Sequence, residues 1–281
     1  MKLAYFPKYC ALNSQPPMAA FLSSCQRHGI ELIPDSLTAD AAVIWSVTWA
    51  GRLLGNQEIF QQYRKTGRPV IILEIGSLHR GHTWKIAVNN ITADGYYGHT
   101  DNLDLDRPAK LKLPLSTDTQ IKDSILIVAQ NNRSLQVNQI PSVDQWILDT
   151  ISCVKKQTQR PIIIRPHPRS KLNIGTLPDN VSLETPAKLV GTYDSFDINY
   201  HHYRVINYNS GAGIQAALTG ANIIVDKSSL AHPVSGTIEQ IDNTTLVDRD
   251  QWTIEIAHTE YLTKEIEKGL WIQRLSPMLP L

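Results

Sequence analysis

Val205-Ile-Asn-Tyr-Asn-Ser-Gly-Ala-Gly-Ile-Gln-Ala-Ala-Leu-Thr-Gly220 is the stretch that decides the fold. Its β-branched start is typical of a buried strand, Ser210 to Gly213 of a tight turn, and Ile214 to Leu218 of a helix. The first N–H groups of a helix bind anions, and glycine removes the Cβ atoms that hold a phosphate away. The stretch therefore predicts a phosphate or diphosphate site. An ordinary turn that needs glycine for positive φ is the alternative.

Short apolar strands alternate with helical segments on both sides of this stretch. We expect strands at residues 2–6, 31–33, 41–46, 70–74, 124–129, 161–165, 181–183, 205–208 and 222–226. We expect helices at residues 18–28, 56–66, 143–157, 214–218, 254–258 and 263–275. Such alternation predicts an α/β fold with parallel sheets that carry helices on both faces.

The composition bounds the class of protein. The chain has 281 residues, 42% of them hydrophobic and 19% charged, which fits a globular protein with one large or two medium domains. Lys and Arg number 27 against 26 Asp and Glu, so no global field demands a nucleic acid or a membrane, although a local patch remains possible. The cysteines Cys10, Cys25 and Cys153 show neither metal-ligand spacing nor a complete disulfide set.

No apolar run approaches the ~20 residues of a membrane span, and the first residues lack the apolar core of a signal peptide. We therefore expect a cytoplasmic protein. The segment 101–120, rich in Asp, Pro, Leu and Lys, predicts a linker between two Rossmann-like domains, 1–118 and 119–281, which face one another across a cleft. The C-terminal helix could return to the first domain. A ligand is expected at the carboxyl ends of the strands.

Polar residues follow several of these strands. Arg165-Pro-His167-Pro-Arg169 closes the strand at 161–165, and its prolines hold a cation and an imidazole in place for a phosphate. Asp226-Lys227-Ser228 closes the strand at 222–226 and offers a carboxylate and a hydroxyl to a sugar or ribose. Surface charges and a solvated loop are the alternatives.

In the first half, Glu74-Ile-Gly-Ser-Leu-His-Arg80-Gly-His82 follows the strand at 70–74. Glu or His at a strand end can take a proton from a hydroxyl while Arg holds negative charge. A simple pair between Glu74 and Arg80 is the alternative, and Asp94 is a second candidate base. The histidine spacing does not suit a metal, and Asp104-Leu-Asp106 falls in the linker, so we expect no obligatory metal or other cofactor.

The motifs resemble those of a known group of enzymes. Arg165-Pro-His-Pro and Asn209-Ser-Gly-Ala-Gly-Ile-Gln-Ala-Ala-Leu-Thr-Gly-Ala221 are similar to the donor-binding half of GT-B glycosyltransferases, above all the capsular-polysaccharide Kdo transferases. In that group the segment matching residues 73–77 commonly reads Glu-Asp-Gly-Phe, and Ile75 stands where an Asp would be.

Residues 45–98 also resemble bacteriophage-encoded glycosyltransferases, through Gly51-Arg52, Asn56, Arg68-Pro-Val, Leu73-Glu-Ile-Gly and His82-Thr-Trp-Lys-Ile-Ala-Val-Asn-Asn-Ile91. Gln251-Trp-Thr and Glu265-Ile-Glu-Lys-Gly269 resemble their C-terminal ends. The two resemblances imply a GT-B fold, with an acceptor-side first domain and a second domain that binds a nucleotide sugar. They imply metal-independent transfer of a hexose or pentose from a UDP-sugar to a hydroxyl, in the host cytoplasm if the chain is phage-encoded.

The resemblances also distribute the candidate residues. The donor would contact Arg165, His167, Asn209, Ser210, Gly211, Ala212, Gly213, Gln215, Asp226, Lys227 and Ser228. The acceptor would contact Trp49, Arg52, Asn56, His79, His82, Trp84 and Lys85, with Glu74, Asp94 and Arg80 catalytic.

The phage resemblance implies that the acceptor is a hydroxymethylated base, of the 5-hydroxymethylcytosine type, in double-stranded DNA. Residues 52–85 support it with Arg52, Arg64, Lys65, Arg68, Arg80 and Lys85, and Trp49 or Trp84 could stack on an extruded base. A cell-surface polysaccharide or lipid-linked saccharide is the alternative acceptor.

Other classes of protein stay open. Gly211-Ala-Gly213-Ile-Gln-Ala216 also satisfies a short dinucleotide fingerprint, although Asp226 follows sooner than the ~20 residues expected in an NAD enzyme. A nucleotide-sugar epimerase and a non-catalytic module that binds sugar or nucleic acid are further alternatives.

Overall fold

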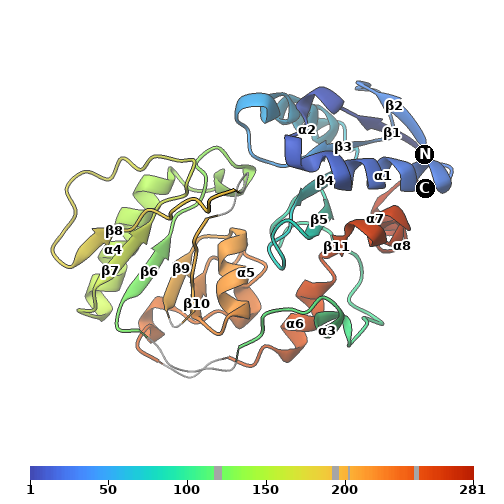
Figure 1. Ribbon diagram of the computed structural model, residues 1–281. Coiled ribbons are helices and arrows are strands. Elements are labelled where there is room, and N and C mark those ends of the chain that lie inside the picture. The colour runs from blue at the N-terminus through green and yellow to red at the C-terminus, as the bar shows by residue number, and fades with distance from the viewer. Residues whose placement is uncertain (117–121, 192–195, 202, 244–246) are drawn as a thin grey trace. The chain divides into compact units, whose positions relative to one another are not determined.

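The computed structural model describes residues 1–116, 122–191, 196–201, 203–243 and 247–281, which form two compact units (Figure 1). Unit 1 comprises Met1–Lys112, Arg133–Leu135 and Thr253–Leu281, and unit 2 comprises Leu113–Asn132 and Gln136–Trp252. The predicted boundary between residues 118 and 119, and linker residues 117–120, lie outside the described residues. The C-terminal segment groups with unit 1.

Unit 1 contains a six-stranded sheet in the order β11-β5-β4-β3-β1-β2. Its strands are β1 Lys2–Tyr5, β2 Glu31–Pro34, β3 Ala41–Trp45, β4 Val70–Ile75, β5 Thr83–Val88 and β11 Glu260–Leu262. β1 to β4 are parallel, but β5 is antiparallel to β4 and β11 is antiparallel to β5. The expected all-parallel sheet is therefore wrong for this unit. The turn between β4 and β5 is too short to hold a crossover helix, so the chain can return only as a hairpin.

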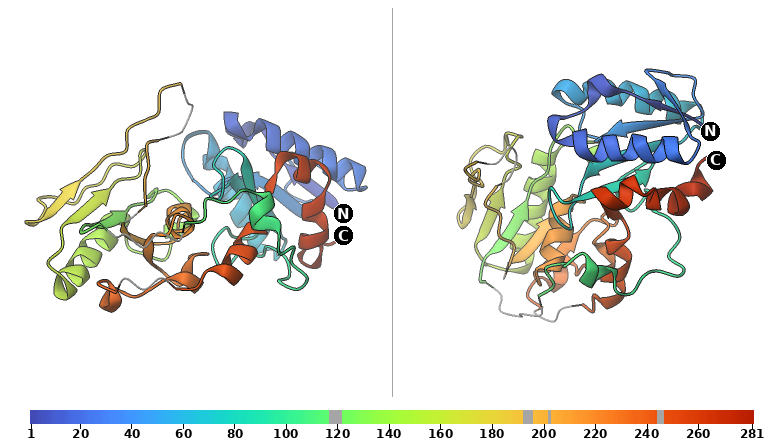
Figure 2. Two further views of the ribbon diagram at one scale, coloured as in Figure 1. Left: turned by 60° about the horizontal axis from the view of Figure 1, so that its bottom comes forward. Right: turned by 45° about the vertical axis from the view of Figure 1, so that its right-hand side comes forward.

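Both faces of this sheet are covered by helices (Figure 2). The helices of unit 1 are α1 Gln15–Arg27, α2 Gly55–Lys65, α3 Arg107–Lys110, α7 Thr263–Glu267 and α8 Leu270–Leu275, and α6 Asp250–Ala257 ends in it. Phe21 of α1 and Trp271 of α8 stack at 4.3 Å on one face, which they share with Leu73. Tyr63 of α2 packs on the other face with Ile72. Successive strand residues thus alternate between the two cores.

Unit 2 contains a five-stranded parallel sheet in the order β10-β9-β6-β7-β8. Its strands are β6 Ile125–Val128, β7 Ile162–Arg165, β8 Val181–Leu183, β9 Arg204–Asn207 and β10 Asn222–Val225, and its main helices are α4 Val143–Gln157 and α5 Gly211–Leu218. Ser142 caps α4 by accepting a bond from Gln145 N at 3.0 Å, as its position before the helix predicts. Both units are Rossmann-like α/β layers, and the predicted fold class is confirmed in each.

The expected linker is only partly irregular. Its described part contains α3, whose Arg107 binds the C-terminal segment of unit 1. No helix among the described residues has the length and apolar character to cross a membrane.

Candidate active site

The carboxyl edge of the unit 2 sheet gathers the residues that follow its strands. Arg165, Val128, Asn207 and Val225 are aligned in register as the last residues of β7, β6, β9 and β10. Residues just beyond them therefore meet at one edge, which is where α/β folds bind ligands.

Helix α5 begins at this edge with Ser210 as its N-cap. The Ser210 hydroxyl accepts a bond from Ala212 N at 3.4 Å and donates one to Asn207 Oδ1 at 3.2 Å. Asn207 is buried, and its amide nitrogen donates to Val128 O at 2.9 Å. The strand-to-helix turn is thus fixed by its own side chains before any ligand binds, with the positive end of the helix dipole at the edge.

Asn209 organises the same edge through a buried amide network. Its Nδ2 donates to Gln136 O at 3.0 Å and to Ser228 Oγ at 2.9 Å. Its Oδ1 accepts from Gln130 Nε2 at 2.9 Å, and its backbone N–H donates to Gln130 Oε1 at 3.1 Å. Sequence reasoning found Asn209 and Ser228 but missed Gln130 and Gln136. Gln130 lies just beyond β6, and a polar residue after an apolar strand was the signal available for it.

The segment after β10 forms a tight turn around its carboxylate. Asp226 Oδ1 accepts from Ser228 N at 2.9 Å and from Ser228 Oγ at 2.6 Å, so both side chains are engaged within the fold. The side chain of Lys227 is exposed, and that of Gln215 on α5 is partly exposed. Of the segment expected to contact the sugar, Lys227 is the most accessible residue, and Ser228 is buried.

Arg165 and His167 are differently placed, although they are two residues apart. Arg165 is 4% exposed; it donates to Glu184 Oε1 at 2.5 Å and to Asn199 O at 3.1 Å. The buried guanidinium therefore binds two surface segments of unit 2, one just after β8 and one before β9. The His167 ring is partly exposed, and its Nδ1 accepts from Arg169 N at 3.1 Å. That bond leaves the proton of the neutral ring on Nε2.

Gly213 requires a correction. A Cβ atom at this position would lie 3.0 Å from Val225 Cγ1 and 3.3 Å from Asn207 Oδ1. The missing side chain therefore permits close packing of α5 on β9 and β10, and it does not open room for a phosphate as the sequence suggested. Gly213 N also donates to Ser210 O at 3.1 Å. A dinucleotide fingerprint needs the second glycine for approach of the pyrophosphate, so this packing role argues against an NAD site.

In unit 1, Glu74 lies near the carboxyl end of β4 and is partly exposed. Its Oε2 accepts from Ser46 Oγ at 2.6 Å, and its Oε1 accepts from Ile75 N at 2.9 Å. Ser46 follows β3 and holds φ at 67°, the left-handed region that costs a non-glycine residue about 1 to 3 kcal/mol. The strained residue thus presents its hydroxyl to the carboxylate, and no sequence signal pointed to it.

His79, Arg80 and His82 lie in the turn between β4 and β5, at the same edge as Glu74. His79 Nε2 is 2.9 Å from Lys112 O, and the His79 and His82 rings meet edge to face at 6.4 Å. Arg80 and His82 are exposed. Apart from Asp94, the predicted acid/base residues therefore come from the end of β4 and the turn that follows it.

Asp94 lies in the loop after β5 and is exposed. Because β5 runs antiparallel to β4, with Val88 opposite Ile71, this loop lies at the edge where β4 begins. Asp94 is thus at the opposite end of the strand from Glu74, and this geometry separates the two candidate bases.

Three residues expected at the acceptor are buried instead. Trp84 is 6% exposed and donates to Thr263 Oγ1 at 2.9 Å, so its ring is not available to stack on a base. Asn56 is 1% exposed and donates to Trp45 O at 2.7 Å. Lys85 is 4% exposed in the middle of β5. Its charge suggested a surface position, but β5 has a paired strand on each side, and the lysine is buried there.

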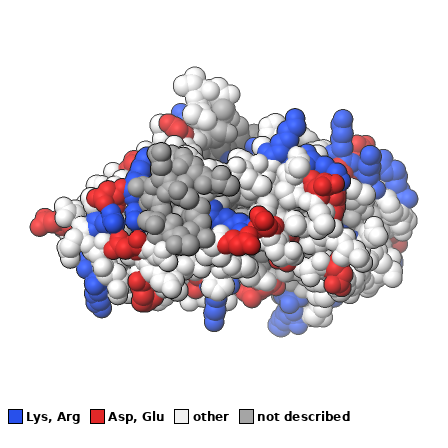
Figure 3. Space-filling model, turned by 90° about the horizontal axis from the view of Figure 1, so that it is seen from below, with Lys and Arg blue, Asp and Glu red and all other residues white. Residues whose placement is uncertain are grey.

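The basic segment at residues 52–85 is not a single surface. Arg52 precedes α2 at the carboxyl edge, whereas Arg64 and Lys65 end this 11-residue helix about 16 Å away. Arg68 binds Ala39 O at 2.7 Å and Leu37 O at 2.8 Å, and Lys85 is buried. Figure 3 draws one face of the molecule, which carries both basic and acidic side chains. The electrostatic argument for DNA therefore loses its support.

An open hollow of about 760 Å³ does lie at the carboxyl edge of unit 1. Its lining comes from the segments after β1 and β3 and from the first turns of α2: Lys8, Tyr9, Gly51, Arg52, Leu54, Gly55, Gln57, Glu58 and Gln61. Trp49, from the same loop as Arg52, is partly exposed, and its ring centroid lies 5.9 Å from that of Phe60. Within the described residues, no group of three His, Cys, Asp or Glu side chains could hold a metal ion.

No protein-family model and no curated protein matches the sequence. Solved structures do match. The β-Kdo 2,4-transferase of Thermosulfurimonas dismutans KpsC superposes with a TM-score of 0.54 and 12% identity, over 96% of this chain and 98% of that chain. The β-Kdo 2,7-transferase of the same KpsC gives 0.46 and 13%, over 96% and 99%. The UDP-GlcNAc 2-epimerase of Methanocaldococcus jannaschii gives 0.36 and 10%, over 99% and 100%.

The fold is therefore of the GT-B type, with two Rossmann-like domains, as the sequence predicts. The similarity to the 2,4-transferase establishes the fold alone, because the sequence identity is low.

Proposed function

We propose that the protein is a glycosyltransferase that takes a nucleotide-activated sugar at the carboxyl edge of unit 2 and a hydroxyl acceptor at the carboxyl edge of unit 1. The observation that carries the proposal is the Glu74 carboxylate, partly exposed at a strand end and held by the strained Ser46 at 2.6 Å. A solved structure named as a sugar transferase shares the fold over nearly the whole chain, which supports this reaction class.

Glu74 would act as general base. Each carboxylate oxygen accepts one bond within the protein, from Ser46 Oγ or Ile75 N, and retains a lone pair for the acceptor. Glu74 takes the hydroxyl proton as the acceptor oxygen bonds to the anomeric carbon, and the nucleotide leaves with the electrons of the broken C–O bond. The exposed guanidinium of Arg80 lies on the same edge, where it can hold negative charge.

Unit 2 would bind the nucleotide. The start of α5 presents its dipole to the diphosphate, and the partly exposed His167 ring follows β7, which β6 separates from β9 in the sheet. The Asn209 network fixes the backbone of this edge, so the donor site is formed before the ligand arrives. A UDP-sugar remains our proposal for the donor.

For the acceptor we propose a saccharide hydroxyl. The hollow beside α2 offers the ring of Tyr9 and the amides of Gln57 and Gln61, which suit a sugar, and the related fold belongs to a Kdo transferase. A hydroxymethylated base in duplex DNA is the competing acceptor, for which Trp49, Arg52 and Arg80 remain exposed or partly exposed.

The test begins with a panel of nucleotide sugars and the melting temperature of the protein, since a ligand of the folded state raises it. The donor so found is then offered with saccharide, lipid-linked and hydroxymethylated-DNA acceptors. Glu74→Gln should lower turnover by about 10²- to 10⁴-fold and leave donor binding unchanged. The matched control is Glu31→Gln, an exposed carboxylate on β2 of the same sheet.

If no nucleotide sugar raises the melting temperature, the donor assignment is wrong. If Glu74→Gln keeps full activity, Glu74 is not the general base. Transfer to modified DNA, weakened by salt with a slope of about −0.9 per phosphate contact, would replace the saccharide by DNA.

A further inference from the structure

Three charged side chains form a row across the sheet of unit 1. Glu74 of β4 is directly opposite Lys85 of β5, and Lys85 is directly opposite Glu260 of β11. Directly opposed residues of antiparallel strands point to the same face, with Cβ atoms about 4.5 to 5.5 Å apart. This is the face that carries α2, because Ala87, two residues after Lys85, packs in that core.

Glu260 is fully buried, and donors surround its carboxylate. Oε1 accepts from Ser77 N at 2.6 Å, and Oε2 accepts from Leu78 N at 3.1 Å and from Thr83 Oγ1 at 2.7 Å. Two backbone N–H groups and one hydroxyl thus surround this carboxylate. Glu260, from the C-terminal segment, therefore fixes both ends of the turn that carries Arg80.

Lys85 is 4% exposed and lies on the strand between those of Glu74 and Glu260. Burial lowers the pKa of Lys85, and the charges of Glu260 and Glu74 raise it again. Tyr97, from the loop after β5, also faces the row: burial and the Glu260 charge raise its pKa, and its hydroxyl lacks a hydrogen-bond partner in the described part of the chain. Lys85 is thus the basic residue of the middle strand in a row whose two outer members are carboxylates.

We propose that Lys85 is a positioning residue that keeps Glu74 ionised and in place for the reaction, and that Glu260 joins this row to the turn between β4 and β5. The inference rests on the proposed role of Glu74 as base. Without the ammonium, no positive charge in this row offsets the repulsion between the Glu260 and Glu74 carboxylates, which favours the protonated form of Glu74. The base then becomes available only at higher pH.

The test compares Lys85→Met, Lys85→Arg and the control Lys2→Met, which removes an exposed lysine from the same sheet. The acidic limb of log(kcat/KM) against pH should move up by about one pH unit or more in Lys85→Met, and not in the other two variants. Glu260→Gln removes the repelling charge instead, so it should move the limb down. A merely structural role would not give shifts of opposite sign.

A second readout needs no activity. In protein labelled with ¹³C-glutamate, the carboxyl signal that Glu74→Gln removes should titrate at higher pH in Lys85→Met and at lower pH in Glu260→Gln. If the enzyme assay fails, this measurement still decides the inference. An unchanged titration midpoint in either variant, with native circular dichroism, would overturn it.

Discussion

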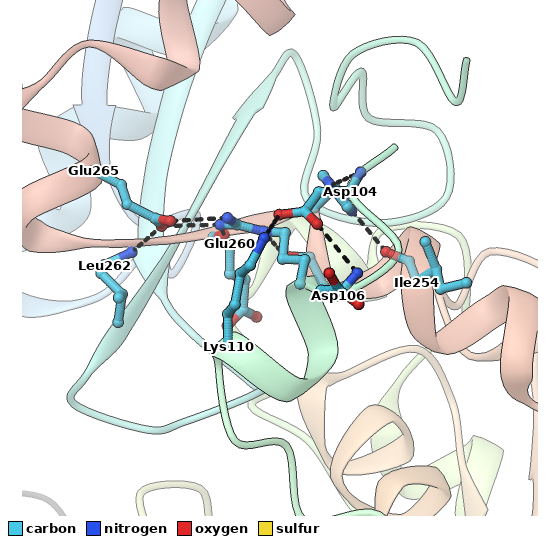
Figure 4. Close-up of polar contacts among 10 residues, drawn as sticks. Asp104, Asp106, Lys110, Ile254, Glu260, Leu262 and Glu265 are labelled. Atoms are coloured by element: carbon cyan, nitrogen blue, oxygen red, sulfur yellow. Dashed lines mark hydrogen bonds and ion pairs between the residues drawn. The ribbon is translucent and has the colours of Figure 1, made fainter. Parts of the chain in front are cut away.

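Arg107 on α3 joins the expected linker segment to the C-terminal part of unit 1. Figure 4 shows polar contacts in this region, with Glu260 and Glu265 labelled. Its two terminal nitrogens bind the Glu265 carboxylate at 2.8 and 2.9 Å. Its Nε donates to Ala257 O at 2.7 Å, and one terminal nitrogen also donates to Glu260 O at 2.7 Å. The Arg107 side chain thus binds three residues of the C-terminal segment: Ala257, Glu260 and Glu265.

We predict that Arg107→Met lowers the free energy of unfolding by about 2 to 4 kcal/mol. Removing one partner of a buried pair costs about 3 to 5 kcal/mol, and Arg107 and Glu265, at 11% and 20% side-chain exposure, keep some water. Two backbone carbonyls also lose a charged donor. With a urea dependence of about 3 kcal/mol per M, the midpoint should fall by about 1 M.

Lys110→Met is the matched control on the same helix. Lys110 contacts Asp104 at 2.7 Å, a shorter distance than any from Arg107 to Glu265, but these side chains are 61% and 42% exposed. An exposed pair contributes little to stability, so this change should leave the midpoint within error. The assay is urea unfolding followed by tryptophan fluorescence. Equal shifts in the two variants would refute the reasoning from burial.

Three further outcomes are expected. His258 is neutral, because its Nδ1 bonds Ile254 O at 2.8 Å and its Nε2 accepts from Asp104 N at 3.2 Å. Burial lowers its pKa from 6.5, so its stabilising effect is complete above that pH and declines as pH falls below it; urea unfolding from pH 8 to 5 measures this decline, which His258→Asn should reduce. Gly213→Val should lower the melting temperature by several degrees, whereas Gly213→Ala should change it less, since a gain of about 1 kcal/mol in helix propensity offsets part of the crowding. Asn209→Ala should weaken binding of the stabilising nucleotide sugar in calorimetry, and equal affinity in a folded variant would contradict the preformed donor edge.

Sequence reasoning placed the parallel strands and the longer helices because their signals are local. An apolar run such as Ala41–Trp45 is buried on both faces, and α4 shows a helical period with a capping serine. β5 and β11 were missed because their own residues give only weak strand signals. Lys85 interrupts the apolar run of β5, β11 has three residues, and both strands exist only by pairing with their neighbours.

The candidate site was predicted in part. Glu74 and Asn209 were found because polar residues at strand ends converge in any parallel sheet. Trp84 and Lys85 lie on β5, which was not among the expected strands. Without a predicted strand, the sequence could not show which side chains face a core, so the burial of these two residues was missed. Ser46 could not be found, since its importance lies in its backbone angle.

Two glycines show how far a motif can be interpreted without its surroundings. A Cβ atom on Gly76 would lie 2.3 Å from Thr83 O and 2.4 Å from Glu260 Oε2, while one on Gly213 would meet Val225. Neither glycine is explained by a ligand, because protein atoms already occupy the space that a side chain would need. In Glu74-Ile-Gly76, that space belongs to a carboxylate 183 residues from the turn at Ser77 that it binds. The motif beside the proposed base therefore makes physical sense only once the C-terminal segment has returned to the sheet.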